Sequence, residues 1–122
     1  MKMAIAFKHL TKRADGRTHI VGHRLTPYDI LTEYELGEEP EVLAEEYKLS
    51  LAEVYEALAY AFDHPDEMAG IREDNRAAEM KGIERLAEHL REFAREQMDK
   101  DEQAYQEAAK KAKERRHGAA VP

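Results

Sequence analysis

Three helix-start signals fall close together in this 122-residue chain, and they restrict its fold more than any other feature. The first is Thr26 followed by Pro27, because threonine is a good N-cap residue and proline loses no hydrogen bond at the first helical position. The second lies at Pro40. The third is Ser50 with Glu53, which have the spacing of a reciprocal capping box. Helices this closely spaced are short and must bury their apolar faces on one another, so the stretch is predicted to form a small tri-helical unit.

Stop signals separate the three helices. Gly37 suits the position after a helix end, and Pro65 ends the third helix. The third helix has the clearest apolar periodicity, and its stripe is expected to face the core. The stripe consists of Leu51, Val54, Tyr55, Leu58, Ala61 and Phe62. A short second helix, a tight turn and a third helix are typical of a helix-turn-helix unit, here of homeodomain-like type.

A short β-hairpin is predicted in front of the helices. Ile5 and Phe7 alternate with smaller or polar residues, and the run at 18–21 is rich in β-branched residues. Asp15 and Gly16 between them form a turn dipeptide. A two-stranded hairpin is marginal in water on its own, so it is expected to pack on the helices or to pair along its edge with another chain.

A helical pattern begins at Asp66 and meets no strong breaker for roughly 50 residues, which would give a helix of about 75 Å. That length exceeds a small core, so the segment is predicted to project, to fold back at Gly82 or near Asp99, or to pair with a partner. The predicted fold is therefore mainly α. Residues 1–65 form the hairpin and tri-helical domain, and residues 66–122 form a long C-terminal helical extension.

The net charge of −7 is unevenly distributed. Residues 1–25 hold six lysines and arginines against one acid, residues 26–67 hold one lysine against thirteen acids, and residues 68–122 hold twelve of each. The acidic whole disfavours nonspecific nucleic-acid binding. The basic N-terminal segment is nevertheless suited to local phosphate contacts.

The composition also bears on the compartment. The chain has no cysteine, which excludes disulfides and thiolate metal sites and suits a reducing cytoplasm. The apolar start is interrupted at Lys8, too soon for a signal peptide. No apolar run approaches the roughly 18 residues of a membrane span. We therefore expect a cytoplasmic protein with no membrane partner.

Nucleic-acid binding is expected at the N-terminal segment rather than at the third helix. That helix carries no lysine or arginine, and its positions expected to be exposed include Glu53, Glu56 and Asp63, which would repel phosphates. The candidate DNA-binding residues are Lys8, Lys12, Arg13, Arg17, His23 and Arg24. The alternative is that these residues are solvated, or that Arg24 pairs with the acidic helices of its own chain.

No residue pattern favours catalysis. The six histidines are scattered without metal-ligand spacing, and the tyrosines fall mostly on apolar stripes, which indicates core residues. Glycine-rich phosphate loops, nucleophile elbows and paired carboxylates in an apolar pocket do not occur. We expect a protein that is not an enzyme and that uses no cofactor or metal.

The C-terminal extension carries an apolar stripe among alternating charges, which is typical of a partner-binding helix. The candidate partner-binding residues are Met80, Ile83, Leu86, Leu90 and Phe93. Two alternatives remain open. The helix pairs with its own copy in a homodimer, or it is a solvated helix with i,i+4 ion pairs worth a few tenths of a kcal/mol each.

Two runs resemble a known family. The run I-V-G-H-R-L-T-P-Y-D-I-L at 20–31 is similar to the pattern I-x-G-T-R-I-x-V/P-x-x-I/L-L, and L-A-Y-A at 58–61 is similar to an A-L-A-Y-A signature. The family is the domain of unknown function numbered 433, which resembles antitoxins of the VapB type. The resemblance covers about residues 8–68. The chain departs from the pattern at His23, where the family usually has threonine, and in the loop 13–17, which replaces Gly-Gly-Lys-Pro.

The resemblance implies a helix-turn-helix antitoxin that neutralises a PIN-like nuclease toxin. In this chain the C-terminal helical region would bind the toxin, and the globular half would form a homodimer and regulate its own expression by binding operator DNA. The residues alone leave open a structural homo-oligomer or a transcription-factor-like module with no toxin partner.

Overall fold

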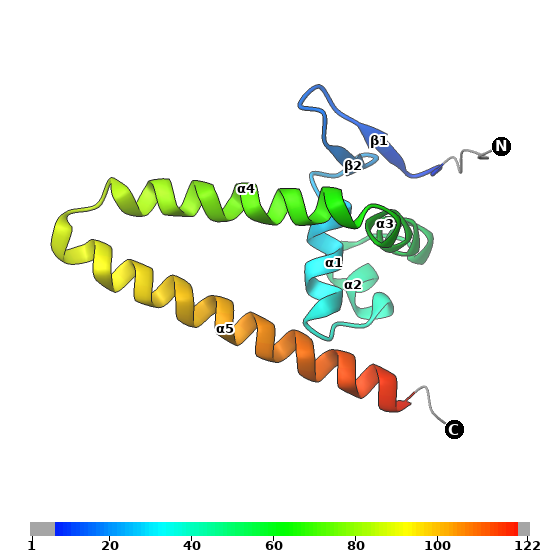
Figure 1. Ribbon diagram of the computed structural model, residues 1–122. Helices are drawn as coiled ribbons and strands as arrows, with labels where there is room; N and C mark the ends of the chain where they lie inside the picture. The colour runs from blue at the N-terminus through cyan, green and yellow to red at the C-terminus, as the bar shows by residue number, and fades with distance from the viewer. Residues whose placement is uncertain (1–6, 120–122) are drawn as a thin grey trace. The chain divides into compact units, whose positions relative to one another are not determined.

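The computed structural model describes residues 7–119 (Figure 1). Two strands are followed by five helices. The elements are β1 (Leu10–Lys12), β2 (Thr18–Ile20), α1 (Pro27–Glu35), α2 (Pro40–Tyr47), α3 (Leu51–Asp63), α4 (Pro65–Glu84) and α5 (Glu88–Ala119). The predicted mainly α fold is confirmed, with a two-stranded hairpin, three short helices and a long helical C-terminal region.

The described chain divides into two compact units. Residues 7–34 and 38–65 form the first, which we call the N-terminal unit. Residues 35–37 and 66–119 form the second, which we call the C-terminal unit. The main change of unit therefore follows Pro65, where α4 begins.

The predicted helix starts are confirmed, and local hydrogen bonds explain two of them. The Thr26 hydroxyl accepts from the Asp29 backbone N–H at 3.2 Å, and the Asp29 carboxylate accepts from the Thr26 N–H at 2.9 Å. Ser50 and Glu53 form the predicted capping box, with distances of 3.1 and 2.9 Å. Pro40 is the first residue of α2. The two reciprocal pairs satisfy backbone N–H groups that a first helical turn otherwise leaves without partners.

Two residues with positive φ end the first two helices. Gly37, the predicted stop after α1, has φ 108°, which glycine adopts without a steric penalty. Lys48 follows α2 in the left-handed conformation with φ 56°. Its backbone N–H donates to carbonyls of the last turn of α2. Gly37 was readable from the sequence, whereas nothing in the sequence marked Lys48, because lysine rarely takes this conformation.

The β-hairpin lies further along the chain than predicted. β1 pairs antiparallel with β2, with Leu10 opposite Ile20. The predicted first strand was placed on Ile5, which lies outside the described residues, and Phe7, which is not in a strand. The Phe7 ring instead meets the Tyr60 ring edge-on, with centroids 5.7 Å apart. Phe7 therefore packs inside its own unit rather than forming a strand edge.

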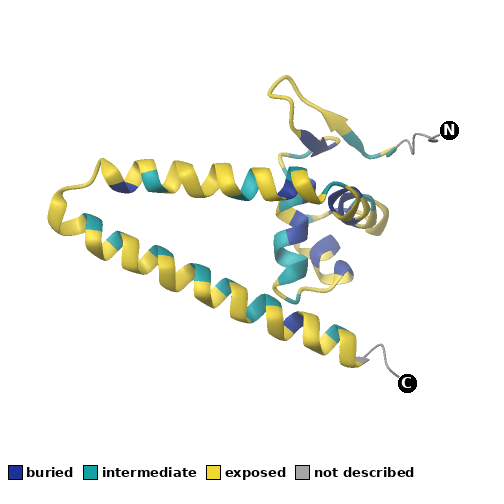
Figure 2. Cartoon of the chain, viewed as in Figure 1, coloured by how far each residue is buried: buried dark blue, intermediate teal, exposed yellow. Residues whose placement is uncertain are grey.

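The N-terminal unit encloses a small aliphatic core. Ile20, Ile30, Leu43 and Val54 are fully buried, and they come from β2, α1, α2 and α3 in turn. Figure 2 shows this burial as dark blue segments on these elements. One buried polar contact lies beside the core, where the Thr18 hydroxyl donates to the Tyr60 hydroxyl at 3.1 Å. The hairpin and the three helices thus share one core, which explains how a two-stranded sheet persists here.

The C-terminal unit is an antiparallel pair of helices that spread apart from their turn (Figure 1). The chain folds back at residues 85–87, between α4 and α5. Both predicted bend points are wrong, because Gly82 lies inside α4 and Asp99 inside α5. The turn is closed by the backbone bond from Leu86 N–H to the Ile83 carbonyl at 3.0 Å.

Candidate interaction surfaces

The β-hairpin carries the predicted DNA-binding residues, and most of them reach solvent. The exposed members are Lys8, Lys12, Arg13, Arg17 and Arg24. Lys12, Arg13 and Arg17 lie at the loop end, and we call these three the loop cluster. Within residues 7–119 no acid lies at ion-pair distance from Arg24. The alternative in which Arg24 pairs with the acidic helices is therefore not seen.

His23 differs from the other predicted DNA-binding residues because it faces α3. Its Nε2 lies 3.6 Å from Glu53 Oε2, and its backbone carbonyl accepts from Arg13 Nη2 at 2.6 Å. His9 makes a closer pair with the next turn of α3. Its backbone N–H donates to Glu56 Oε2 at 2.7 Å, and its Nδ1 lies 2.9 Å from the same oxygen. These contacts fasten the hairpin to α3 and leave His23 half-buried.

The solvent-facing side of α3 differs from the predicted one. Glu53 and Glu56 were expected to be exposed, but they are half-buried against the hairpin. Leu51, Tyr55 and Phe62 were expected in the core, but they are 44%, 50% and 59% exposed. The residues that α3 does bury include Val54, Ala57, Leu58 and Ala61. The hairpin covers the acidic side of α3, and the core covers only part of its apolar stripe, so the edge of the stripe beside the buried Leu58 remains exposed.

The three exposed residues and the half-buried Tyr34 form one surface, which we call the α3 aromatic patch: Tyr34, Leu51, Tyr55 and Phe62. At about 100° per residue, the three α3 members fall within about 40° of one another around the helix. Tyr34 extends the patch onto α1, since its ring meets the Phe62 ring edge-on with centroids 5.9 Å apart. The patch joins two helices and two kinds of side chain, aromatic and aliphatic.

Carboxylates border the α3 aromatic patch. The Tyr55 hydroxyl donates to Glu41 Oε1 at 3.3 Å. The negative charge of Glu41, with a smaller contribution from Glu39, raises the pKa of Tyr55. Sequence reasoning missed this patch because it assigned the whole apolar stripe of α3 to the core. The available signal was the excess of apolar positions, which is too wide for a helix that buries a single face.

A second apolar surface lies at the turn of the C-terminal unit. Leu86, Leu90 and Phe93 are 37%, 45% and 61% exposed. We call these three residues the arm-tip patch. The other two predicted partner-binding residues do not join it, because Met80 is half-buried and Ile83 is buried. Met80 and Ile83 lie on α4, whereas Leu90 and Phe93 lie on α5. The turn at 85–87 lies between the two helices, so the two pairs of residues do not share one helix face.

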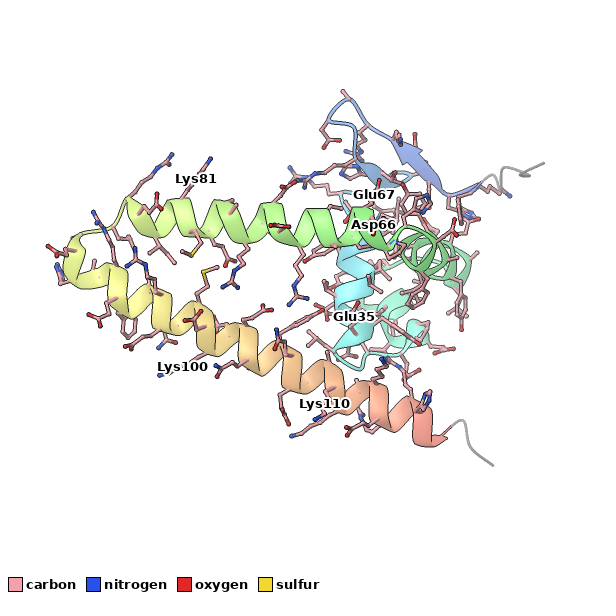
Figure 3. The ribbon with its side chains drawn as sticks, in the orientation of Figure 1. Glu35, Asp66, Glu67, Lys81, Lys100 and Lys110 are labelled. Atoms are coloured by element: carbon pink, nitrogen blue, oxygen red, sulfur yellow. The ribbon has the colours of Figure 1, made fainter. Side chains whose placement is uncertain are left out.

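The facing sides of α4 and α5 meet largely through polar groups. Arg72 donates to the Glu102 carboxylate, and its guanidinium carbon lies 4.7 Å from the centroid of the Tyr105 ring. Arg76 and Asp99 form a looser pair at 3.9 Å. The hydrogen bond from Arg72 lowers the pKa of Glu102. Figure 3 shows the labelled lysines Lys81 and Lys100 on the outer sides of this pair of helices.

Residues 7–119 show no metal-ion site and no membrane-spanning helix. No three His, Asp or Glu side chains come together in a group that could hold a metal ion. No helix in that range is long and apolar enough to cross a membrane. The features that stand out on this part of the chain are therefore the loop cluster, the α3 aromatic patch and the arm-tip patch.

Comparison with known proteins concerns the N-terminal half. Residues 11–61 match a family model described as "Protein of unknown function (DUF433)". The match begins in β1 and ends in α3, so it covers the hairpin and the three short helices and stops before α4. Comparison with curated proteins and with solved structures found no match. The family resemblance inferred from residues 20–31 and 58–61 is confirmed by this match, which covers residues 11–61 and so less than half of the chain.

Proposed function

We propose that this chain is an antitoxin-like protein that acts by stoichiometric binding, without turnover, and that it holds a PIN-like nuclease through its C-terminal unit. The observation that carries this proposal is the arm-tip patch, Leu86, Leu90 and Phe93, each more than one third exposed. Leu90 and Phe93 lie three residues apart on α5, and Leu86 precedes them in the turn. This spacing is that of a helix face which docks into an apolar groove.

Leaving these apolar side chains in water costs free energy that binding a partner would recover. Fully burying a leucine or phenylalanine is worth about 1.5–3 kcal/mol. Large apolar side chains that gather on a surface mark interaction sites more often than scattered ones do. Arg91 and Glu92 flank the patch on α5, and mixed charges at a rim set the orientation of a partner. The proposed contact excludes Met80, which is half-buried, and Ile83, which is buried.

The test is affinity capture of the tagged full-length chain from its native cells, followed by mass spectrometry. The wild type is expected to retain a small nuclease, and Leu90→Ala/Phe93→Ala is expected to lose it, with affinity reduced at least about tenfold. The matched control is Lys81→Ala/Lys100→Ala, which changes two outward side chains of the same unit. Equal capture by the wild type and the Leu90→Ala/Phe93→Ala variant would remove the arm-tip patch from the proposal.

We propose operator binding as a second activity, carried by the loop cluster of Lys12, Arg13 and Arg17. Exposed cations on a two-stranded ribbon can contact DNA phosphates, and each such contact steepens the dependence of affinity on salt. This proposal places DNA on the hairpin, since the exposed side of α3 is apolar and bordered by acids.

Fluorescence anisotropy with the DNA that precedes the coding sequence tests this activity. Lys12→Ala/Arg17→Ala is expected to weaken binding and to reduce the salt slope by about one for each cation removed. Arg13 is left unchanged because it also holds the His23 carbonyl. Lys81→Ala/Lys100→Ala serves as the control for net charge. An unchanged salt slope in the hairpin variant would exclude the loop cluster from the DNA contact.

A further inference from the structure

We propose that the α3 aromatic patch is the contact surface for a second copy of this chain, whose basic hairpin base lies across it. The hairpin base is defined by Lys8, Val21 and Arg24. The family resemblance implies a homodimer of the globular half, and this inference names the surface that would form it. The interface requires neither a nuclease nor an operator, so it can be tested apart from the function proposed above. It also uses none of the residues of the loop cluster or the arm-tip patch.

The α3 aromatic patch exposes a large apolar area. Leu51, Tyr55 and Phe62 are each at least 44% exposed, and they lie on one narrow side of α3. Aromatic side chains bring a large apolar area and prefer edge-on or offset neighbours, as the Tyr34–Phe62 pair already shows. A surface of this kind is stabilised when another apolar surface covers it.

Acidic side chains border the α3 aromatic patch. Glu41 accepts a hydrogen bond from Tyr55 at the edge of the patch, and residues 26–67 hold thirteen acids against one lysine. Two α3 patches that met face to face would bring like charges together, which is unfavourable. An aromatic ring beside a carboxylate is instead a favourable environment for an arginine, which stacks on the ring and pairs with the acid. The complementary surface is therefore apolar and basic.

The chain itself carries an apolar and basic surface at the base of its hairpin. Residues 1–25 are the one net basic segment of the three, with six cations and one acid. At its hairpin base Val21 is 49% exposed, although it is a β-branched apolar residue. The Val21 N–H donates to the His9 carbonyl at 2.8 Å, which places Val21 beside the residue that follows Lys8. Arg24, also exposed, comes three residues later.

The hairpin base and the α3 aromatic patch are therefore complementary in apolar character and in charge. Val21 offers an apolar centre for the α3 aromatic patch, and Arg24 offers a guanidinium for Tyr55 and Glu41. Each copy of the chain has one hairpin base and one patch. We propose that two copies are related by a two-fold axis, because that arrangement covers both patches at once and closes the assembly as a dimer.

The test is sedimentation velocity of the full-length chain over a range of concentrations and salt. The wild type is expected to dimerise, and its dimer is expected to weaken as salt rises. Arg24→Glu and Glu41→Lys are each expected to raise the dimer dissociation constant at least about tenfold, since each places like charges at both contacts. Phe62→Ala, which changes no charge, is expected to weaken the dimer as well.

The decisive measurement mixes the two charge variants. In a mixed dimer one contact is wild type, and the other has its two charges exchanged. Equimolar Arg24→Glu and Glu41→Lys chains are therefore expected to recover the dimer that neither forms alone. The matched controls are Arg17→Glu at the hairpin loop and Glu46→Lys on α2, both exposed, and neither is expected to change the wild-type dimer.

Three results would overturn the proposal. The first is a wild-type chain that is monomeric at every concentration. The second is a dimer that Leu90→Ala/Phe93→Ala abolishes and the α3 variants leave intact. The third is a mixture of the charge variants that stays monomeric. None of these results depends on whether a nuclease is captured, so they are distinguishable from a failure of the antitoxin proposal.

Discussion

The two units of this chain hold their structure by different means. The N-terminal unit buries Ile20, Ile30, Leu43 and Val54 completely. In the C-terminal unit the buried hydrophobic residues are few: Met68, Ile83 and Ala112. The facing sides of α4 and α5 are joined instead by the ion pairs from Arg72 and Arg76. Figure 2 shows the contrast, with burial concentrated in the short helices and exposure dominating the long ones.

This difference bears on how each unit responds to its surroundings. Apolar burial depends little on mild changes of pH, because it involves no titrating group. Ion pairs between partly exposed side chains are weak and screened by salt. The aliphatic core of the N-terminal unit is therefore expected to persist under mild changes of pH, although its hairpin is held on α3 by the polar contacts His9–Glu56 and His23–Glu53. The C-terminal unit is expected to change readily when a partner binds.

The largest predicted effect comes from the core of the N-terminal unit. Leu43→Ala is expected to lower the free energy of unfolding by about 2–5 kcal/mol, because it removes buried methyl groups and leaves a cavity. Urea denaturation followed by circular dichroism, with hydrogen exchange of α1–α3 peptides, measures it. Leu90→Ala is the control, and a change within about 0.5 kcal/mol is expected there. Equal effects of the two substitutions would contradict the contrast between the units.

A smaller effect is predicted at the start of α3. Ser50→Ala is expected to lower the free energy of unfolding by about 1 kcal/mol, since it removes one half of the capping box. Ser50→Gly is the matched variant, for which only a few tenths of a kcal/mol are expected. The same urea titrations measure both. If serine, alanine and glycine at this position gave equal stability, the hydrogen bonds of the capping box would not stabilise α3.

The smallest effect, and the most dependent on conditions, is predicted between α4 and α5. Arg72 lowers the pKa of Glu102 below its ordinary 4.5. The ionised Glu102 carboxylate therefore contributes its full stabilisation of the folded state above pH 4.5. This contribution is lost as pH falls through the lowered pKa of the folded state. Glu102→Gln is expected to lack this pH-dependent part. Because Glu102 is one third exposed, the change is expected to be small.

Thermal unfolding of the C-terminal unit, followed by circular dichroism between about pH 7 and pH 3, tests this expectation. The wild type and Glu102→Gln are expected to converge at the acid end. Raising the salt concentration is expected to bring them together at neutral pH as well. A difference that persisted in acid would indicate a packing role for Glu102 instead of an electrostatic one.

Some features of α3 could be predicted from the sequence and others could not. Its start at Ser50 and its end before Pro65 were predictable, because caps and prolines act within a few residues. Its exposed side was not, because Glu53 and Glu56 are covered by His23 and His9. Those partners are separated from α3 by two other helices in the chain. The residue pattern of a single helix cannot show that its acidic side chains will be covered and its aromatic side chains exposed.

The sequence by itself determined the order of the elements, the helix starts at Pro27, Pro40 and Leu51, and the change of unit after Pro65. These depend on hydrogen bonds and backbone angles within one or two turns. The tertiary structure alone decided which side of α3 is uncovered, and where the chain turns between α4 and α5. The turn at 85–87 has no glycine or proline to mark it. Its position depends on contacts between residues some thirty apart, such as Arg72 with Glu102, and such contacts exist only once the chain has folded.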